Sequence, residues 1–203
     1  MIVMPRLYAV ADQTFGDPVQ LAKALFSGGV QLVQIRDKMA TAQTLLAEVE
    51  EALKAAPPGV RIIVNDRSDV ARIAGAAGVH LGQGDLAPAF ARRALASGQI
   101  VGYSTHSLSQ ALDADKEPVD YIAVGPIFAT TTKVNPDPVI GLDRLREICS
   151  KVTKPVVAIG GITLETARDV LSCGATSVAV IGDLLKHGNV AARTRQWMDH
   201  LES

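Results

Sequence analysis

A polar loop follows one of the apolar runs of this chain, and its residue types suit the binding of phosphate oxygens. The apolar run spans 121–124, and residues 125–133 after it read Gly-Pro-Ile-Phe-Ala-Thr-Thr-Thr-Lys. Ligands bind at the carboxyl ends of buried parallel strands, and hydroxyls with one cation are typical phosphate partners. The candidate binding residues of this loop are Thr130, Thr131, Thr132 and Lys133. A solvated threonine-rich loop is the alternative for this segment taken alone.

A second polar group follows the apolar run 32–35. Gln34, Arg36 and Lys38 alternate along the chain, so they share one face if the extended conformation continues past the run. Two buried cations are costly unless an anion compensates them, and a bound diphosphate is such an anion. A surface ion pair between Arg36 and Asp37 is the structural alternative.

Two aspartates follow neighbouring apolar runs. Asp66 comes after the run 62–64, next to Asn65, and Asp85 follows the run 79–81. Adjacent strand ends are neighbours in a closed parallel sheet, so the two carboxylates can converge, and they then repel each other unless a cation or a proton lies between them. Beside a diphosphate, Mg²⁺ fits this position, because it accepts one or two carboxylates together with phosphate oxygens. Each aspartate can instead cap the helix that follows it.

Three further runs end in groups that can contact a ligand. Ser104 can hydrogen-bond a phosphate or a heterocycle, whereas His106 close by is interpreted as a hydrogen-bonded structural residue rather than a base. Gly161 follows the seventh run, and Ile181 and Gly182 end the eighth. Glycines there let backbone N–H groups approach a second phosphate, at the two loops that commonly bind phosphate in barrels.

Eight short apolar runs must position these groups. They alternate with segments of helical period, which is typical of βαβ units in a parallel sheet. The runs span 7–10, 32–35, 62–64, 79–81, 100–102, 121–124, 156–159 and 178–181, and the clearest helical patterns span 41–56, 141–151 and 164–173. A doubly wound sheet of five or six strands would leave two runs unused. The chain is therefore predicted to be an α/β protein with the (β/α)8 TIM barrel fold.

Composition indicates one domain over residues 1–203 and a small-molecule ligand. The chain is 48% hydrophobic, its net charge is −1, and no linker or charge block divides it. Near-neutral charge argues against nucleic-acid or membrane-surface partners and favours phosphorylated small molecules. No apolar run approaches the ~18 residues that span a bilayer, and the beginning of the chain has no signal-peptide pattern, so a cytoplasmic protein is expected. A homo-oligomer remains open.

Six ordered motifs resemble those of the thiamine-phosphate synthase family, from residue 7 to about residue 185. The motifs are residues 34–38, 65–67, 78–85, 102–106, 125–133 and 158–162. The resemblance implies a (β/α)8 barrel and a Mg²⁺-dependent transferase of thiamine biosynthesis. Such an enzyme joins 4-amino-2-methyl-5-hydroxymethylpyrimidine diphosphate to 4-methyl-5-(2-hydroxyethyl)thiazole phosphate, or to its carboxylated form, and releases diphosphate.

The resemblance also implies a role for each matching residue. The pyrimidine diphosphate would contact Gln34, Arg36, Lys38, Asn65, Ser104 and Lys133. The thiazole phosphate would contact Thr130, Thr131, Thr132, Gly161, Ile181 and Gly182. Asp66 and Asp85 would hold Mg²⁺. The catalytic residues, which stabilise the charge of the departing diphosphate, would be Lys133, Arg36 and Lys38.

Two positions depart from the family pattern, and two alternative functions remain. Gly182 stands where the family often has serine, and Ala129 stands where it often has proline. A thiazole tautomerase of the same superfamily is expected to lack both the paired aspartates and the threonine-lysine loop. A noncatalytic phosphate-binding barrel needs the phosphate loops but neither Asp66 nor Asp85.

Overall fold

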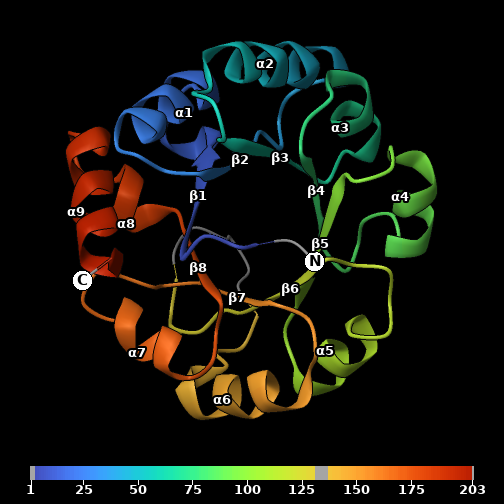
Figure 1. The fold of residues 1–203 in the computed structure, drawn as a ribbon, viewed down its shortest axis with the longest axis vertical. Coiled ribbons are helices and arrows are strands. Elements are labelled where there is room, and N and C mark those ends of the chain that lie inside the picture. Colours follow the sequence, from blue (N-terminus) through green and yellow to red (C-terminus); the bar gives the residue numbers. More distant parts are fainter. Residues whose placement is uncertain (1–2, 131–136, 203) are drawn as a thin grey trace.

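The computed structural model describes residues 3–130 and 137–202, and eight parallel strands within them close into a barrel (Figure 1). Each strand pairs with the next along the chain, and the eighth pairs with the first. The strands are β1 (Leu7–Asp12), β2 (Leu32–Arg36), β3 (Arg61–Asn65), β4 (Gly78–Leu81), β5 (Ile100–Thr105), β6 (Tyr121–Val124), β7 (Val156–Ile159) and β8 (Ser177–Val180). The predicted (β/α)8 barrel is confirmed.

Helices surround the barrel (Figure 1). They are α1 (Pro18–Ser27), α2 (Ala42–Ala55), α3 (Ser68–Ala74), α4 (Pro88–Ala94), α5 (Leu108–Ala114), α6 (Gly141–Lys151), α7 (Ala167–Ser172), α8 (Gly182–Leu185) and α9 (Val190–Glu202), with a short 3-10 helix η1 (Gln13–Phe15) after β1. Across residues 3–130 and 137–202, none of these helices has both the length and the apolar character that a lipid bilayer requires.

Two helix boundaries show how side chains set the ends of elements. The Thr41 hydroxyl accepts a hydrogen bond from the Thr44 N–H and so caps α2, as a helix-start signal predicts. Helix α7 begins at Ala167, later than the helical pattern 164–173 suggested. The reason is a turn before it, in which the Thr166 hydroxyl accepts a hydrogen bond of 3.0 Å from the Thr163 N–H.

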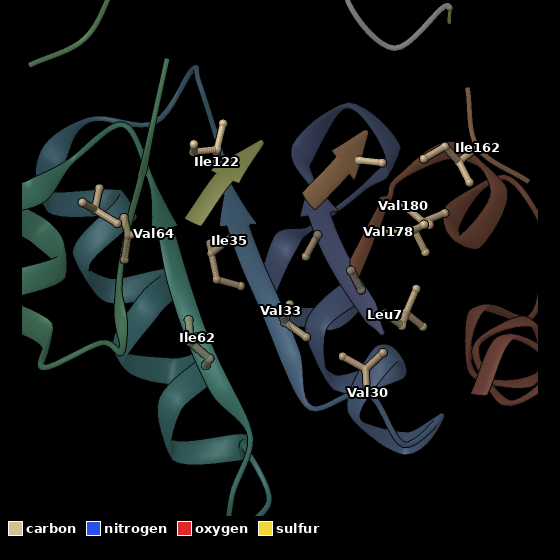
Figure 2. Close-up of a cluster of buried hydrophobic side chains, with 14 of the residues drawn as sticks. Leu7, Val30, Val33, Ile35, Ile62, Val64, Ile122, Ile162, Val178 and Val180 are labelled. Atoms are coloured by element: carbon tan, nitrogen blue, oxygen red, sulfur yellow. The ribbon is translucent and has the colours of Figure 1, made fainter. Parts of the chain in front are cut away.

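Alternate side chains of each strand point outward, into an apolar layer between the barrel and its helices. Figure 2 shows part of this layer, including Val33 and Ile35 of β2 and Ile62 and Val64 of β3. These four side chains have no solvent exposure. Burial of this layer supplies the main stabilisation of the barrel, because burying each such side chain contributes about 1.5–3 kcal/mol.

The other side chains fill the barrel interior, and their character changes along the barrel axis. Apolar and aromatic residues such as Leu32, Ile63 and Tyr121 are buried there. Gly102 of β5 makes room for the Tyr121 ring, since a Cβ at Gly102 would lie 2.0 Å from Tyr121 Cζ. Toward the carboxyl ends of the strands, the buried polar side chains include Gln34, Asn65 and His80. The packed core therefore ends in a polar surface at that end.

Several strands extend further toward their carboxyl ends than the apolar runs predicted. Strand β1 ends at Asp12, β2 at Arg36 and β5 at Thr105. The backbone ladder continues through polar residues, with Asp12 aligned to Arg36 and Ser104 aligned to Ala123. Apolar side chains signal burial rather than hydrogen bonding, so they mark only the buried part of a strand. Ser104 consequently lies on a strand instead of in a loop.

Candidate active site

A cavity of about 890 Å³ opens at the carboxyl ends of the barrel strands. Every predicted site residue that the structure describes lines it. These residues are Gln34, Arg36, Lys38, Asn65, Asp66, Asp85, Ser104, Thr130, Gly161, Ile181 and Gly182. The other predicted site residues, Thr131, Thr132 and Lys133, lie outside the described residues. Barrel closure thus brings together side chains from strands distant in sequence, at the end where barrels bind ligands.

The carboxylates of Asp66 and Asp85 meet in this cavity. Burial raises the pKa of Asp85, and the nearby Asp66 carboxylate raises it further. Lys38 Nζ lies 3.1 Å from Asp66 Oδ2, and the Gly82 N–H donates to Asp85 Oδ2 over 2.7 Å. One ammonium group and one N–H leave lone pairs on both carboxylates, so the pair can accept a cation between them.

Neither aspartate caps a helix in this structure, so the capping alternative is wrong for both. Helix α3 begins after Arg67, and α4 begins after Ala87, and neither start has a side-chain cap. Asp66 adopts φ +61°, a left-handed conformation that no other non-glycine residue among the described ones adopts. This conformation is uncommon for side chains other than Asn and Asp, and such outliers cluster at functional sites.

The Arg36 guanidinium forms an ion pair with Asp12, a residue that the sequence analysis did not select. Asp12 is completely buried, and its other oxygen accepts hydrogen bonds from the Thr14 N–H and hydroxyl over 2.9 and 2.7 Å. The alternative of an Arg36–Asp37 pair is wrong, because Asp37 accepts from backbone N–H groups of its own loop. The period-two alternation of a strand could have selected Asp12, because Asp12 lies two residues beyond the first apolar run and therefore faces the same side as the last residue of that run.

A chain of hydrogen bonds crosses the barrel beneath the cavity. Ser104 Oγ lies 2.9 Å from His80 Nε2, and His80 Nδ1 lies 2.9 Å from the Tyr121 hydroxyl. The Tyr121 hydroxyl donates to the Tyr8 hydroxyl over 3.1 Å, and Gln34 Nε2 donates to the same oxygen over 2.8 Å. The chain connects the two predicted pyrimidine contacts Gln34 and Ser104 through residues that the sequence analysis did not include in the site.

Burial keeps the groups in the middle of this chain uncharged. It lowers the pKa of His80 to about 4, so the ring is neutral at physiological pH. Burial also raises the pKa of Tyr8 and of Tyr121. The His80 ring stacks on Tyr121 with centroids 5.7 Å apart and planes 15° apart, and Tyr121 meets Tyr8 edge to face. This packing holds the cavity floor in one arrangement.

His106 is held by hydrogen bonds, in keeping with its interpretation as a structural residue. Its Nδ1 lies 2.7 Å from the Gly125 carbonyl oxygen, and its backbone N–H donates to Gln110 Oε1. Its Nε2 lies 3.5 Å from a carboxylate oxygen of Asp137. The ring therefore links the end of β5 to the segments on both sides of the threonine-rich loop.

Glycine turns form the opposite side of the cavity, after β7. Gly160 and Gly161 have φ values of +99° and +65°, which side chains rarely adopt. A Cβ on Gly161 would lie 2.4 Å from the Ala129 carbonyl oxygen. The two glycines therefore allow this loop to pack against the loop after β6 and leave backbone groups at the cavity wall.

Helix α8, which follows β8, is anchored to the last helix through Asp183. The Asp183 carboxylate accepts hydrogen bonds from the Arg193 guanidinium and, over 2.7 Å, from Trp197 Nε1. Asp183 and the exposed residue Lys186 also line the cavity, and the sequence analysis missed both. This anchor holds Gly182 and its neighbours against the cavity wall.

Comparison with known proteins identifies the family. The family model described as thiamine monophosphate synthase matches residues 7–184 of this chain. The chain belongs to this family. The thiamine-phosphate synthase of Koribacter versatilis (strain Ellin345) is 51% identical over 189 residues, which cover 90% of each protein. The thiamine-phosphate synthase of Chloroflexus aurantiacus is 43% identical over 202 residues, which cover 96% of this chain and 92% of that protein. The resemblance inferred from the six motifs is confirmed.

A solved structure of a thiamine phosphate pyrophosphorylase has the same fold. The thiamine phosphate pyrophosphorylase from Pyrococcus furiosus superposes with a TM-score of 0.89 at 33% identity, covering 97% of this chain and 95% of that one. In the present chain, the cavity has two chemically different sides. Carboxylates and cations lie at the ends of β2 to β4, whereas a glycine turn follows β7 and Gly182 begins α8 after β8. Such an arrangement can hold two different anionic ligands at once.

Proposed function

We propose that this chain joins 4-amino-2-methyl-5-hydroxymethylpyrimidine diphosphate to 4-methyl-5-(2-hydroxyethyl)thiazole phosphate, or to its carboxylated form, and releases diphosphate. The product is thiamine phosphate. One observation carries the proposal: in a member of the thiamine monophosphate synthase family, paired carboxylates with two cations share one cavity with the glycine turn after β7 and with Gly182 at the start of α8. The paired carboxylates also disfavour the tautomerase and the noncatalytic phosphate-binding barrel, since neither alternative requires them.

The pyrimidine diphosphate is assigned to the side of the cavity at β2 to β5. Its phosphates contact Arg36 and Lys38, which supply cationic donors, and Asn65. Its heterocycle contacts Gln34 and Ser104, which line the cavity at the two ends of the buried hydrogen-bond chain. Lys133 is the remaining proposed contact to this ligand, and its role rests on the family motif alone.

The thiazole phosphate is assigned to the other side of the cavity. Backbone N–H groups near Gly161 and Gly182 suit a phosphate, because they can approach it without an intervening side chain. Ile181 is the N-cap residue of α8, directly before Gly182. The threonine hydroxyls of the loop after β6 complete this subsite, and the full set is Thr130, Thr131, Thr132, Gly161, Ile181 and Gly182.

Asp66 and Asp85 fit Mg²⁺ as a cofactor. Both are carboxylates, which magnesium prefers, and they meet closely enough for Asp66 to raise the pKa of Asp85. The described residues contain no group of three or more potential ligands, so the diphosphate oxygens and water would complete the coordination. When bound, Mg²⁺ supplies positive charge that stabilises the departing diphosphate.

The reaction places its main demand on the leaving group. The C–O bond to diphosphate breaks, and the electron pair leaves with the oxygen, while the aminopyrimidine ring delocalises the positive charge that develops on the CH₂ carbon. The thiazole nitrogen then donates its lone pair to that carbon, so no protein base is needed. Arg36, Lys38 and Lys133 stabilise the developing negative charge, and each well-aimed donor contributes about 3 kcal/mol. The anchored thiazole phosphate holds the nucleophile in line.

A direct assay tests the proposal. Purified protein is incubated with both substrates and Mg²⁺, and thiamine phosphate is measured by the fluorescence of its oxidised form. We expect product that depends on both substrates and that disappears in excess EDTA. Absence of product under conditions in which the protein is folded would overturn the proposed function.

A further inference from the structure

Each hydroxyl beneath the cavity carries one proton, so the direction of one hydrogen bond limits the direction of the next. The Tyr8 hydroxyl oxygen accepts from Gln34 Nε2 over 2.8 Å and from the Tyr121 hydroxyl over 3.1 Å. A tyrosine hydroxyl carries one proton, so Tyr121 has none left for its other neighbour. Its oxygen can therefore only accept a hydrogen bond from His80 Nδ1, which lies 2.9 Å away.

The next link follows from the same rule. The His80 ring is buried between the Tyr121 phenol and the Ser104 hydroxyl, which are both uncharged. A second proton on the ring would bury a cation without an anion as hydrogen-bond partner, which is costly. With its single proton on Nδ1, the ring presents a lone pair at Nε2, so the Ser104 hydroxyl must donate to it over 2.9 Å.

We infer that the hydrogen bonds of Tyr8 and Tyr121 fix His80 as its Nδ1–H tautomer, and that this tautomer makes Ser104 Oγ a hydrogen-bond acceptor toward the cavity. Ser104 lines the cavity, and its only proton is used on His80. A ligand group at Ser104 must then donate, as an amino group does, whereas a carbonyl group would face the oxygen lone pairs.

This polarity gives the floor of the site a chemical preference. It rests on the proposed function for the identity of the ligand, because an aminopyrimidine presents an exocyclic NH₂ group and its 4-oxo analogue presents a carbonyl oxygen there. Tyr8, Tyr121 and His80 are positioning residues, since they act on the ligand through Ser104. A site whose buried groups are left unpaired by an analogue rejects that analogue strongly.

Nitrogen NMR of the ligand-free protein tests the tautomer directly. In protein labelled with ¹⁵N-histidine, a nitrogen that carries a proton and a nitrogen with a free lone pair have well-separated chemical shifts. We expect a protonated Nδ1 and an unprotonated Nε2 for His80, whose signals are assigned by their absence in a His80→Gln variant. Finding the proton on Nε2, or on both nitrogens, would overturn the inference without any bearing on the proposed reaction.

Two variants test what sets the tautomer. Tyr121→Phe removes the acceptor of the Nδ1 proton, and Tyr8→Phe frees the Tyr121 proton to donate to Nδ1. Both changes should move the His80 proton to Nε2. Tyr103→Phe is the matched control, because Tyr103 belongs to the same barrel sheet but packs in the outer apolar layer, and it should change nothing. Retention of the Nδ1–H tautomer in both variants would show that the two tyrosines do not set it.

Binding then tests the consequence for the ligand. Dissociation constants of the 4-amino and 4-oxo pyrimidine diphosphates are measured by calorimetry with Mg²⁺ and without the thiazole phosphate. The wild-type protein should prefer the 4-amino compound, and Tyr121→Phe and Tyr8→Phe should each reduce that preference about tenfold or more. An unchanged preference in a variant whose tautomer has switched would overturn the link from His80 to Ser104. If neither compound binds the wild-type protein, the proposed function fails while the NMR result still decides the tautomer.

Discussion

Asp66 and Asp85 place two like charges in one partly buried space, an arrangement that is unfavourable unless a cation joins them. Asp66→Asn and Asp85→Asn each replace a charged ligand by a neutral amide. We expect each variant to need about tenfold more Mg²⁺ for half-maximal activity, which corresponds to about 1.4 kcal/mol, and to turn over more slowly. Initial rates over a Mg²⁺ titration give both quantities.

The control for this titration is Asp69→Asn. Asp69 is an aspartate of α3 close to Asp66 in sequence, but its carboxylate is exposed and paired with Arg67. Its substitution should leave the Mg²⁺ requirement unchanged. Full activity of the Asp66 or Asp85 variant in EDTA would contradict the assignment of the metal site.

Asp12 acts on the site through Arg36. Its buried carboxylate holds one guanidinium nitrogen, so the long arginine side chain keeps one orientation instead of many. Asp12→Asn should therefore raise the KM for the pyrimidine diphosphate about tenfold, a loss of about 1.4 kcal/mol, with little change in the KM for the thiazole phosphate. Steady-state kinetics with each substrate varied in turn measures this split.

Thr14→Val provides the matched control for Asp12. It removes the hydroxyl that donates to Asp12 over 2.7 Å and leaves the ion pair with Arg36 in place. The free energy of unfolding should fall by about 1 kcal/mol, and both KM values should stay at the wild-type level. If Asp12→Asn likewise changed only stability, Asp12 would not position Arg36.

At the scale of elements, α2 carries a carboxylate that is poorly placed when charged. Burial, together with the charges of Asp37 and Asp17, raises the pKa of Glu48 from its ordinary 4.5 to about 7. Its Oε2 is buried and has no hydrogen-bond partner among the described residues. Glu48 thus destabilises the folded chain when ionised, because the folded state holds its proton more tightly than the unfolded state does.

The sign of this effect sets a pH window. Near pH 4.5 and below, Glu48 is protonated in the folded state, and the penalty is absent. It grows as the pH rises from about 4.5 and is complete above about 7. Glu48→Gln should therefore raise the melting temperature at pH 8 and leave it nearly unchanged at pH 4.5. Thermal denaturation across this range measures the difference between variant and wild type.

Glu50→Gln is the control for the pH series, because Glu50 is an exposed carboxylate of the same helix. Its substitution should have the same small effect at every pH. A stabilisation by Glu48→Gln that did not depend on pH would indicate a packing effect and contradict the electrostatic explanation.

For the molecule as a whole, the barrel closes only because its interior volume is filled without overlap. Gly102 packs against the Tyr121 ring, and a Cβ at Gly102 would lie 2.0 Å from Tyr121 Cζ. Tyr121 is completely buried. Gly102→Ala should reduce the free energy of unfolding by about 3 kcal/mol or more. For a chain of this length that loss lowers the melting temperature by about 6 °C or more.

Gly188→Ala is the matched control for Gly102. A Cβ at Gly188 meets no atom within 4 Å, and Gly188 has no positive φ. The melting temperature of the Gly188→Ala variant should stay close to that of the wild type. Equal melting temperatures for the two variants would show that the barrel interior can shift to accept a side chain at Gly102.

The amino-acid sequence by itself determined the order of strands and helices and the end of the barrel at which the site lies. Apolar runs mark buried strands, and polar residues directly after them must gather where parallel strands end. For this reason Gln34, Asp66, Asp85 and Gly161 were predicted to share a site, and all of them line one cavity. The motifs that resemble the thiamine-phosphate synthase family selected the same residues.

Only the tertiary structure decided which side chains pair across the barrel. Asp12 and Arg36 meet because β1 and β2 align them, and the hydroxyls of Tyr8 and Tyr121 meet although 113 positions separate them in sequence. Alternation within one strand tells which side chains point inward, but contacts across the interior depend on the register and closure of all eight strands. No local pattern encodes that geometry, so the tautomer of His80 and the ion pair of Arg36 are properties of the closed barrel.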